Sequence, residues 1–527
     1  WSDQKYKPED QIRAEYPIIV EEFIHGKFPR DILDRLRGIL DEFNGQPFIC
    51  RSSSLLEDNF GTSFAGKYDS FFCPNQGSPE ENLNAFTNAI ARIYASALNP
   101  NAILYRHHKG LEDYDERVAV LIQPVEGENY GRYFLPHGAG VAFSRNLYRW
   151  SPQIKREDGF LRLVWGLGTR AVDTIGNDHP RLVALSHPLL HPAASTKMIK
   201  LYSQQFVDMI DLEQNKLVSL PIQEVLNPRY PALRYIAQVD EGDYLTAIRT
   251  STADINSMVV TFDELLRRTP FARIMREALT LLEQEYDSPV DTEFTVEVTN
   301  PQSVHPGVMI SLLQCRPQSH IIDDEAVSIP SDLDEDRIIF ASRRMVPHGA
   351  VKNVRYVLFV THEGYFNLPS QADRTRLERT IGQLNTALKD QDYICVGPGR
   401  WGTSTPDLGV HIAYADIYNT RALIELSGQE VGTSPEPSFG THFFQDMMEA
   451  HIFPLAINLD DKDAKFNHDF FYSTPNRLEE WYAKIDKNLL STIRLVDVKD
   501  FAPHQHLVLV MDDDEGRAVG FLEDDEE

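Results

Sequence analysis

The stretch from Asp291 to Arg316 reads DTEFTVEVTNPQSVHPGVMISLLQCR and has a polar pair near each end. Asp291 and Glu293, the acidic pair, are two residues apart, and so are Gln314 and Arg316, the Gln–Arg pair. Side chains two residues apart on a strand point to the same face. Residues 300–307 are rich in Asn, Pro, Ser and Gly, as is usual for a loop between two antiparallel strands. The stretch therefore predicts a β-hairpin that presents two carboxylates on one strand and an amide and a guanidinium on the next.

The chemistry of these two pairs suits a charged ligand. Carboxylate and amide oxygens are the ligands that a hard divalent cation prefers, and a guanidinium binds phosphate oxygens as a fork. Together the two pairs indicate a site for a nucleoside triphosphate with a bound metal ion.

A plain structural role is the alternative for the acidic pair. Thr295 and Glu297 continue its polar face, which is also typical of a strand with one face in solvent. The Gln–Arg pair favours the functional interpretation, because Ile310 and Leu312 are expected on the same face as that pair. A buried face that ends in an amide and a guanidinium needs polar partners.

A third motif, from Arg51 to Ser54, follows an apolar segment and precedes a loop with Gly61 and Gly66. We expect a short strand at 46–51 that ends at this motif. A guanidinium supplies charge for phosphoryl oxygens, and hydroxyls and free backbone amides supply donors at close range. The alternative is a serine-rich turn whose arginine points outward.

The segment from Arg51 to Gly66 is similar to the Arg-Ser-Ser and Ser-Phe-Ala-Gly segment of phosphoenolpyruvate synthases and pyruvate phosphate dikinases. The resemblance covers about residues 15–320 in the order of that family. Besides the hairpin, it is carried by Tyr105-Arg106, Val118 to Gln123, Gly140 to Phe143, and Gly166-Leu167-Gly168. It implies an α+β fold in which a two-lobed ATP-grasp nucleotide-binding domain holds ATP between its lobes, with Mg²⁺ as a second cofactor.

The resemblance also implies roles for individual residues. Metal ligands are expected at Asp291, Glu293 and Gln314. Catalytic groups are expected at Arg51, Asp291 and Arg316, with Arg316 neutralising charge on the transferring phosphoryl group. The residues expected to bind the nucleotide are Arg51, Ser52, Ser53, Gly66, Gln123, Gly166, Gly168, Glu293, Gln314 and Arg316.

Some of these positions have an open alternative. Gln123 is expected near the adenine, although a hydrogen-bonded strand end is equally consistent with its position. Gly166 and Gly168 form only a short motif. Family members usually continue this motif with Glu, whereas the present chain has Thr169 and Arg170.

Parts of the family pattern have no counterpart in this chain. It opens at Trp1 and lacks the family's initial Gly-Gly-Lys segment, so we expect a fragment or a processed product. The Gly-Gly run before the family's phosphorylated histidine and the substrate motifs of its barrel domain are also absent. Complete conversion of pyruvate to phosphoenolpyruvate by this polypeptide is therefore not expected. The phosphoryl acceptor is unidentified, and either the C-terminal domain or another subunit would supply it.

Composition excludes several classes of partner. The 527 residues are 42% hydrophobic, an ordinary value for a globular protein. The net charge of −28 disfavours nucleic acid and anionic membranes as partners. The four cysteines lack the paired spacing of metal ligands and are expected as reduced, buried thiols. No apolar run approaches the ~20 residues of a membrane span, so we expect a cytoplasmic protein.

The composition changes after Gln318. An acidic linker at 326–336 is expected to separate a nucleotide-binding domain, 1–325, from a C-terminal α/β domain of unknown role, 337–527. In this second domain we expect strands at 354–360, 392–397, 409–414 and 453–458, helices at 371–389, 415–426 and 441–451, and a hairpin at 507–522.

Two runs in the C-terminal domain have more than one interpretation. Gly397 to Gly402 follows a buried strand, and Ser438 to Asp446 opens a helix. Strand-end glycine loops and helix N-termini both favour anions, which indicates a second ligand site. Tight turns and a capped helix are the alternative. His442 as a phosphate acceptor is a further hypothesis.

Two functions are consistent with these features. The first is an ATP- and Mg²⁺-dependent phosphotransferase with an unidentified acceptor. The second is a non-catalytic ATP-binding module in regulation or assembly, which the missing lysine segment and the altered Gly-Leu-Gly motif favour. ATP consumption by the protein and by an Asp291→Ala/Glu293→Ala variant would separate them.

Overall fold

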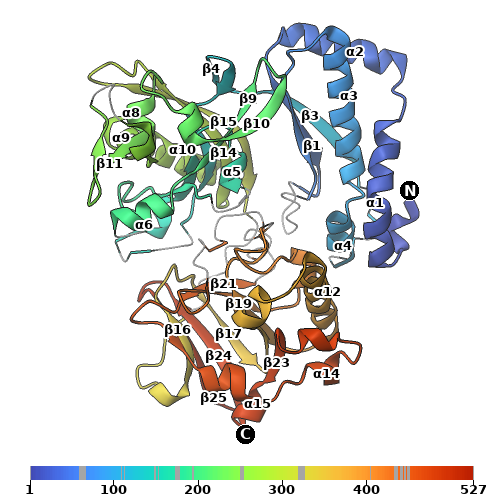
Figure 1. The fold of residues 1–527 in the computed structure, drawn as a ribbon, viewed down its shortest axis with the longest axis vertical. Helices are drawn as coiled ribbons and strands as arrows, with labels where there is room; N and C mark the ends of the chain where they lie inside the picture. Colours follow the sequence, from blue (N-terminus) through green and yellow to red (C-terminus); the bar gives the residue numbers. More distant parts are fainter. Residues whose placement is uncertain are drawn as a thin grey trace.

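A computed structural model describes the chain over residues 2–525, with short gaps (Figure 1). The residues left out are 58–66, 109, 112, 115, 147–149, 152, 173–177, 193–194, 250–253, 319–326, 404, 433–436, 439–442, 444–446 and 448–451. Gly66, His442 and most of the expected helix at 441–451 therefore lie outside the described residues. The described residues form six sheets and many helices, which confirms the α+β class.

Helices cover one face of a three-stranded sheet near the N-terminus (Figure 1). The sheet has the order β2-β1-β3, with bounds Ser70–Cys73, Phe48–Ser54 and Val118–Pro124. α3 (Pro79–Ser96) packs on all three strands. The helices that pack around α3 are α1 (Glu9–Ile24) and α2 (Arg30–Phe43), and α4 (Pro100–His108) contacts α1.

The sequence around α3 explains why this helix forms and which side of β1 it covers. Ser78 and Glu81 form a capping box that satisfies backbone donors of its first turn. The ring of Phe86 packs edge-on against Phe48 of β1, with 4.9 Å between ring centroids. Side chains alternate along a strand, so Arg51 lies on the face of β1 that is turned away from α3.

The central sheet contains the predicted hairpin. Its order is β15-β14-β6-β7-β8, and all neighbouring strands are antiparallel. The bounds are β6 (Gly138–Phe143), β7 (Phe160–Val164), β8 (Arg181–Ala184), β14 (Val290–Thr299) and β15 (Gly307–Pro317). α10 (Phe271–Tyr286) packs on β14 and β15, and its Phe271 and Met275 share a core with Phe294 and Val296.

Two smaller sheets extend this region, with the orders β10-β9-β5-β4 and β12-β11-β13. Their strands are β4 (Glu128–Tyr130), β5 (Tyr133–Leu135), β9 (Phe206–Asp211), β10 (Lys216–Pro221), β11 (Ala237–Asp240), β12 (Leu245–Ala247) and β13 (Met258–Val260). The short helices nearby in the chain are α5 (Thr169–Val172), α6 (Thr196–Leu201), α7 (Ile222–Val225), α8 (Leu233–Ile236) and α9 (Asp263–Arg268).

The last 190 or so residues supply the two remaining sheets. One is antiparallel, with the order β17-β24-β25-β16-β22, and it contains the expected terminal hairpin. Its strands are β16 (Ile338–Ser342), β17 (Gly349–Val354), β22 (Lys465–Phe466), β24 (Gln505–Asp512) and β25 (Arg517–Asp524). The other has the order β21-β20-β19-β18-β23, in which β18 to β21 are parallel. Its strands are β18 (Tyr356–Val360), β19 (Tyr393–Pro398), β20 (Ala422–Ser427), β21 (Phe453–Asn458) and β23 (Ile493–Asp497).

Two of the elements expected in this part are wrong. Residues 409–414 do not form a strand, and Gly409 makes only an isolated bridge to Gly399. β20 lies where we expected the end of a helix at 415–426. The residues of β20 are buried on both faces of the sheet, so the segment has no alternation that distinguishes a strand from a helix.

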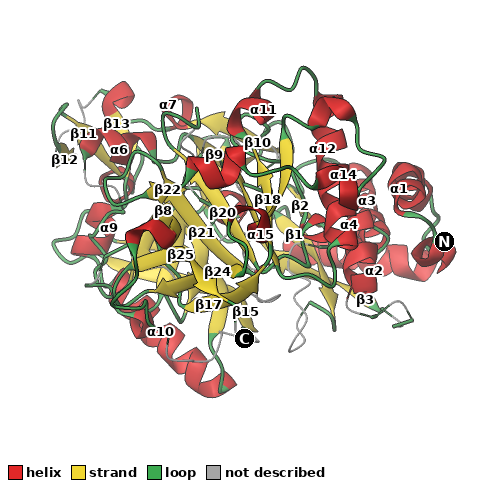
Figure 2. Ribbon diagram, turned by 90° about the horizontal axis from the view of Figure 1, so that it is seen from below, coloured by secondary structure: helices red, strands yellow, loops and turns green. Residues whose placement is uncertain are grey.

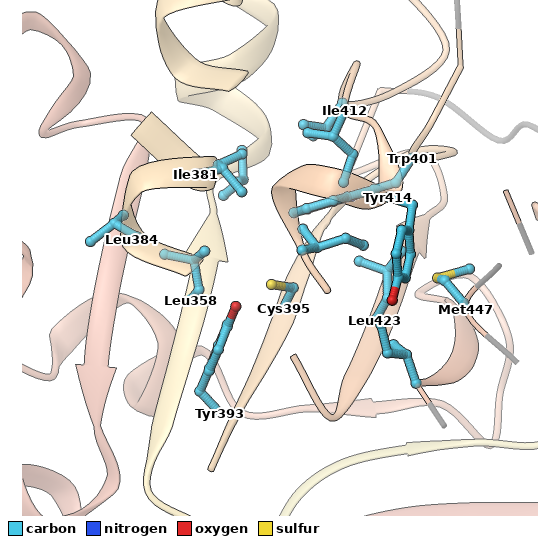
Figure 3. Packing of buried hydrophobic residues seen from close by; sticks show 14 of the residues in the cluster. Leu358, Ile381, Leu384, Tyr393, Cys395, Trp401, Ile412, Tyr414, Leu423 and Met447 are labelled. Carbon is cyan, nitrogen blue, oxygen red and sulfur yellow. The ribbon is translucent and has the colours of Figure 1, made fainter. Parts of the chain in front are cut away.

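One hydrophobic core joins the two parts of the chain. Tyr105 and Phe160 belong to the same buried cluster as Leu358 and Tyr393. Figure 3 shows Leu358, Tyr393 and Cys395 close together in this cluster. In both whole-molecule views, α12 (Gln371–Ala387) and α14 (Leu478–Trp481) lie on the same side as α1 to α4 (Figures 1 and 2).

The four cysteines are free thiols, as expected, but only Cys50, Cys73 and Cys395 are buried, and Cys315 is half-buried. Burial raises the pKa of Cys395 to about 12, so this thiol stays protonated at neutral pH. Among the described helices, none has both the length and the apolar character needed to cross a bilayer.

Candidate nucleotide-binding site

The hairpin brings the acidic pair opposite the Gln–Arg pair, as predicted. β14 and β15 run antiparallel, with Asp291 opposite Arg316 and Glu293 opposite Gln314. Residues directly opposite each other on antiparallel strands share a face. The four side chains therefore lie on one face of the central sheet.

A β-bulge lies on β15 directly before the Gln–Arg pair. The ladder shifts after the pair of Glu293 and Gln314, so that Leu313 has no opposite residue. A bulge residue turns the side chains beyond it to the other face of the sheet. Ile310 and Leu312 therefore lie on the face opposite the Gln–Arg pair, and the expectation that they share its face is wrong.

The polar face of β14 is buried beyond the acidic pair. Thr295 and Glu297 are each only 6% exposed, whereas a strand with one face in solvent would expose them. The half-exposed strand that served as the structural alternative is therefore wrong for this part of β14.

Arg51 reaches the hairpin from β1. Its Nη1 and Nη2 donate hydrogen bonds to the two carboxylate oxygens of Glu293, over 2.7 and 2.9 Å. Nη2 also donates to Oε1 of Gln314, over 2.6 Å. The side chains of Arg51 and Glu293 are 18% and 19% exposed. Three motifs that lie far apart in the sequence are thus in direct contact.

Asp291 and Arg316 form a second ion pair beside the first. The Nε of Arg316 lies 3.2 Å from Oδ1 of Asp291, and both side chains are largely buried. Cys315 is the residue of β15 between Gln314 and Arg316. Burial, together with the nearby Asp291 carboxylate, raises the pKa of Cys315, so its thiol stays protonated.

A cavity of about 380 Å³ lies between the β2-β1-β3 sheet and the central sheet. Its volume is within the range of about 300–1,000 Å³ that is usual for small-molecule sites. The predicted residues that line it are Arg51, Ser52, Gln123, Gly168, Glu293, Gln314 and Arg316. Its apolar lining includes Ile49, Phe72, Val141 and Leu167.

Ser53, Gly166 and Asp291 are described by the structure but are not among the residues that line this cavity. Ser53 lines a second cavity of about 420 Å³, which shares Arg51 and Gln314 with the first. Asp291 is linked to the first cavity through its ion pair with Arg316.

Gly166 instead makes a tight turn. Its φ is +88°, and a Cβ atom there would lie 2.6 Å from the carbonyl oxygen of Asp208. Glycine is therefore the residue that the backbone requires at this position.

The two residues after the Gly-Leu-Gly motif have different environments. Thr169 lines the cavity and donates a hydrogen bond to Oδ2 of Asp208 over 2.6 Å. Arg170 is buried and donates to Asp208 over 2.9 Å and to Asp178 over 2.6 Å. Burial raises the pKa of Asp178, and the hydrogen bonds from Gln205 and Arg170 oppose this shift. Arg170 thus belongs to a buried ion-pair network behind the cavity wall.

The side chain of Gln123 is hydrogen-bonded to the bulge residue, Leu313. Its Nε2 donates to the carbonyl oxygen of Leu313 over 3.1 Å, while the side chain lines the cavity. The bond agrees with a hydrogen-bonded strand end, and contact with adenine stays a prediction.

Two of the three predicted Mg²⁺ ligands, Glu293 and Gln314, contact one nitrogen of Arg51, whereas Asp291 pairs with Arg316. Nη2 of Arg51 lies within hydrogen-bond distance of both Glu293 and Gln314. The guanidinium thus occupies the position of a cation between a carboxylate and an amide oxygen, which are hard ligands suited to Mg²⁺. This donor set fits a divalent ion if Arg51 turns from Glu293 to the phosphates.

Some residues of the site were missed in the sequence. Glu57 lines both cavities and accepts a hydrogen bond from the Ser52 hydroxyl over 2.8 Å. An acidic residue so soon after the serine run is a signal that could have identified it. Thr169 and Asp208 are 39 residues apart, and nothing in their local sequence predicts the contact.

Comparison with known proteins agrees with this geometry. The family model described as pyruvate phosphate dikinase, AMP/ATP-binding domain, matches residues 2–337, which is more than half of the chain. The chain belongs to this family of ATP-binding domains.

Two curated relatives are similar to parts of the chain. A rifampicin phosphotransferase of Streptomyces sviceus is 26% identical over 237 residues, which cover 41% of this chain and 25% of the relative. The phosphoenolpyruvate synthase of Escherichia coli K12 is 29% identical over 197 residues, which cover 34% of this chain and 22% of the relative. The chain thus matches about a quarter of the length of each relative, and the two support a phosphotransferase-like family.

Proposed function

We propose that this chain is the nucleotide-binding part of an ATP- and Mg²⁺-dependent phosphotransferase with a two-lobed ATP-grasp fold. The β2-β1-β3 sheet with its helices would be one lobe, and the central sheet the other. The observation that carries the proposal is the contact of Arg51 with Glu293 and Gln314 at the cavity between these sheets. The ATP-binding family to which the chain belongs supports it.

ATP would lie in the cavity with its phosphates at the polar motifs. Arg51 and Arg316 supply two guanidinium groups there, and Ser52 supplies a hydroxyl. Gln123 would bind the adenine, next to apolar residues such as Ile49. Arginine binds phosphate oxygens through paired, charge-assisted hydrogen bonds, which suits this arrangement.

Phosphoryl transfer depends on positioning and on stabilisation of charge more than on covalent chemistry by the protein. Mg²⁺ held by Glu293 and Gln314 would neutralise charge on the phosphate oxygens. Arg51 and Arg316 would stabilise the charge that develops on the transferring group. Asp291 orients Arg316 through their ion pair, and its second predicted role is to handle a proton or a metal ion.

The phosphoryl acceptor would come from outside this cavity. Either the C-terminal domain, 337–527 beyond the acidic linker 326–336, or another subunit would bind it. The net charge of −28 argues against nucleic acid and anionic membranes as partners. The free thiols are consistent with the reducing cytoplasm.

The test is ATP turnover by an Asp291→Asn/Glu293→Gln double variant. We expect the purified protein to convert ATP with Mg²⁺ to ADP or AMP, and the variant to lose at least about 100-fold in rate. Mass spectrometry of the products would identify the phosphorylated acceptor. Glu285→Gln/Asp287→Asn is a matched control, because these acids have the same spacing and are exposed at the end of α10. Equal turnover in both variants would contradict the proposed roles.

The alternative is a module that binds ATP without turnover. Arg51 engages the predicted metal ligands directly, and Thr169 occupies the position where the family usually has Glu. Calorimetric binding of ATP by the unmodified protein, with no ADP or AMP formed in Mg²⁺ or Mn²⁺, would favour this function.

A further inference from the structure

Glu297 lies on the polar face of β14, four residues beyond Glu293. On a strand this spacing is about 13 Å, so Glu297 is remote from the proposed Mg²⁺ ligands. Its side chain is 8% exposed. In the described part of the chain its Oε1 has no hydrogen-bond partner, and its Oε2 lies 2.8 Å from Nδ1 of His137. A buried carboxylate without a donor is unfavourable unless a cation or a proton compensates its charge.

The nearest group to this carboxylate is His137, which precedes β6 and is buried. Its Nδ1 lies 2.8 Å from Oε2 of Glu297. The same Nδ1 accepts a hydrogen bond from the backbone N–H of Val298 over 3.0 Å. Nδ1 thus lies beside both a carboxylate oxygen of Glu297 and the backbone N–H of Val298.

A cation bound to both Nδ1 of His137 and Oε2 of Glu297 would compensate the charge of the buried carboxylate. Two ligands of a tetrahedral Zn²⁺ ion with bonds of about 2.0–2.1 Å are about 3.4 Å apart, so Nδ1 and Oε2, now 2.8 Å apart, would separate slightly to bind the ion. The ion would replace the Val298 N–H as the partner of Nδ1.

Glu128 on β4 supplies a third ligand from the surface. Its Oε2 lies 3.8 Å from Nε2, the other ring nitrogen of His137, and its side chain is 62% exposed. Glu128 would therefore move to share an ion with Nδ1. Each of Glu128, His137 and Glu297 offers one ligand atom, and these three atoms lie within 4.8 Å of one another. The exposed Glu128 is free to adjust its position, while the other two ligands are held by the fold.

We propose that Glu128, His137 and Glu297 bind a divalent transition-metal ion such as Zn²⁺, at a site separate from the Mg²⁺ of the nucleotide. An imidazole nitrogen with carboxylate oxygens is a ligand set that suits Zn²⁺ and Mn²⁺. The ion would tie β4 and the start of β6 to β14. Pro136, which precedes His137, lines the nucleotide cavity, so the ion would fix one edge of that cavity.

The experiment is metal binding by the untagged, EDTA-treated protein without nucleotide. We expect one Zn²⁺ per chain in a competition titration with a chromophoric chelator, checked by elemental mass spectrometry. His137→Gln and Glu297→Gln should each weaken binding by at least about tenfold. His305→Gln and Glu285→Gln are matched controls on exposed positions and should bind as the unmodified protein does.

A thermal readout tests the same proposal without a chelator. Zn²⁺ should raise the melting temperature of the unmodified protein and of the controls, but not that of the two site variants. Absence of binding by the unmodified protein, or equal binding by His137→Gln and Glu297→Gln, would overturn the proposal and leave an ordinary buried His–Glu pair. Since no nucleotide is present, such a failure would not affect the proposed function.

Discussion

Arg51 connects the two sheets that enclose the cavity in which we propose that ATP binds. Its guanidinium donates hydrogen bonds to Glu293 and Gln314, whose oxygens we propose as ligands of the metal ion. When ATP and Mg²⁺ bind, Arg51 would change partners. The metal ion would bind the oxygens of Glu293 and Gln314, and Arg51 would bind the phosphates. A guanidinium suits both states, because its planar fork matches carboxylate and phosphate groups equally well.

The first prediction concerns Arg51→Met. Methionine fills a similar volume but removes the charge and the donors, so we expect the Kd for ATP with Mg²⁺ to rise by at least about tenfold. Isothermal titration calorimetry measures this change. Arg35→Met on the exposed face of α2 is the control and should leave the Kd unchanged. An unaltered Kd for Arg51→Met would contradict phosphate binding by this residue.

At the scale of the elements, close strand packing determines where the site residues lie. β6 is the neighbour of β14 in the central sheet, and Gly140 of β6 lies opposite Phe294, next to the acidic pair. A Cβ atom on Gly140 would lie 1.9 Å from the carbonyl oxygen of Arg162 on β7. No side chain fits there without separating the strands.

The second prediction is that Gly140→Ala and Gly38→Ala change stability in opposite directions. Overpacking between β6 and β7 should lower the free energy of unfolding by about 3 kcal/mol for Gly140→Ala. Gly38 lies within α2 with open space around its Cα, so Gly38→Ala should raise stability by about 0.5–1 kcal/mol. Urea unfolding of the two variants measures both effects. A neutral Gly140→Ala would show that the strands can move apart at no cost.

The elements also show how far the sequence could predict the site. The two-residue spacing of the acidic pair and of the Gln–Arg pair predicted the hairpin, because strand periodicity is a local property. The bulge at Leu313 depends on how two strands pair and has no local signature. The contact of Arg51 with Glu293 spans 242 residues. The family resemblance assigned both residues to one site but did not predict their direct contact, and spacing alone would have predicted neither. The contact of Thr169 with Asp208 was missed, because Thr169 departs from the family motif and Asp208, 39 residues further on, belongs to no motif.

At the scale of the whole molecule, a buried acid lies where the N-terminal helices meet the C-terminal part. Asp416 ends a short 3₁₀ turn, Tyr414–Asp416, which contacts α4 and α12. Its carboxylate accepts a hydrogen bond from the backbone N–H of Ala413 over 2.8 Å. Burial raises the pKa of Asp416 to about 7, Glu378 adds to the shift, and the hydrogen bond and Arg13 oppose it.

The third prediction is a pH dependence of stability that arises from Asp416. Its pKa is higher in the folded state, so stability falls as pH rises from about 4 to about 7 and then levels off. Asp416→Asn retains an acceptor for Ala413 and removes the charge. We expect the variant to match the unmodified protein near pH 4 and to exceed it by at most about 4 kcal/mol at pH 8. Urea unfolding at several pH values measures the difference, with the exposed Asp461→Asn as control. Parallel curves for both proteins would exclude this effect.

The buried cluster shared by Tyr105, Phe160, Leu358 and Tyr393 has a practical consequence. The family match ends at residue 337, which invites truncation at that point. A chain cut there would remove Tyr414 and the other C-terminal members of this cluster, and the ring of Tyr105, 5.5 Å from that of Tyr414, would lose this cover. We expect such a truncated product to precipitate or to need detergent, so expression plasmids should retain both halves of the coding sequence.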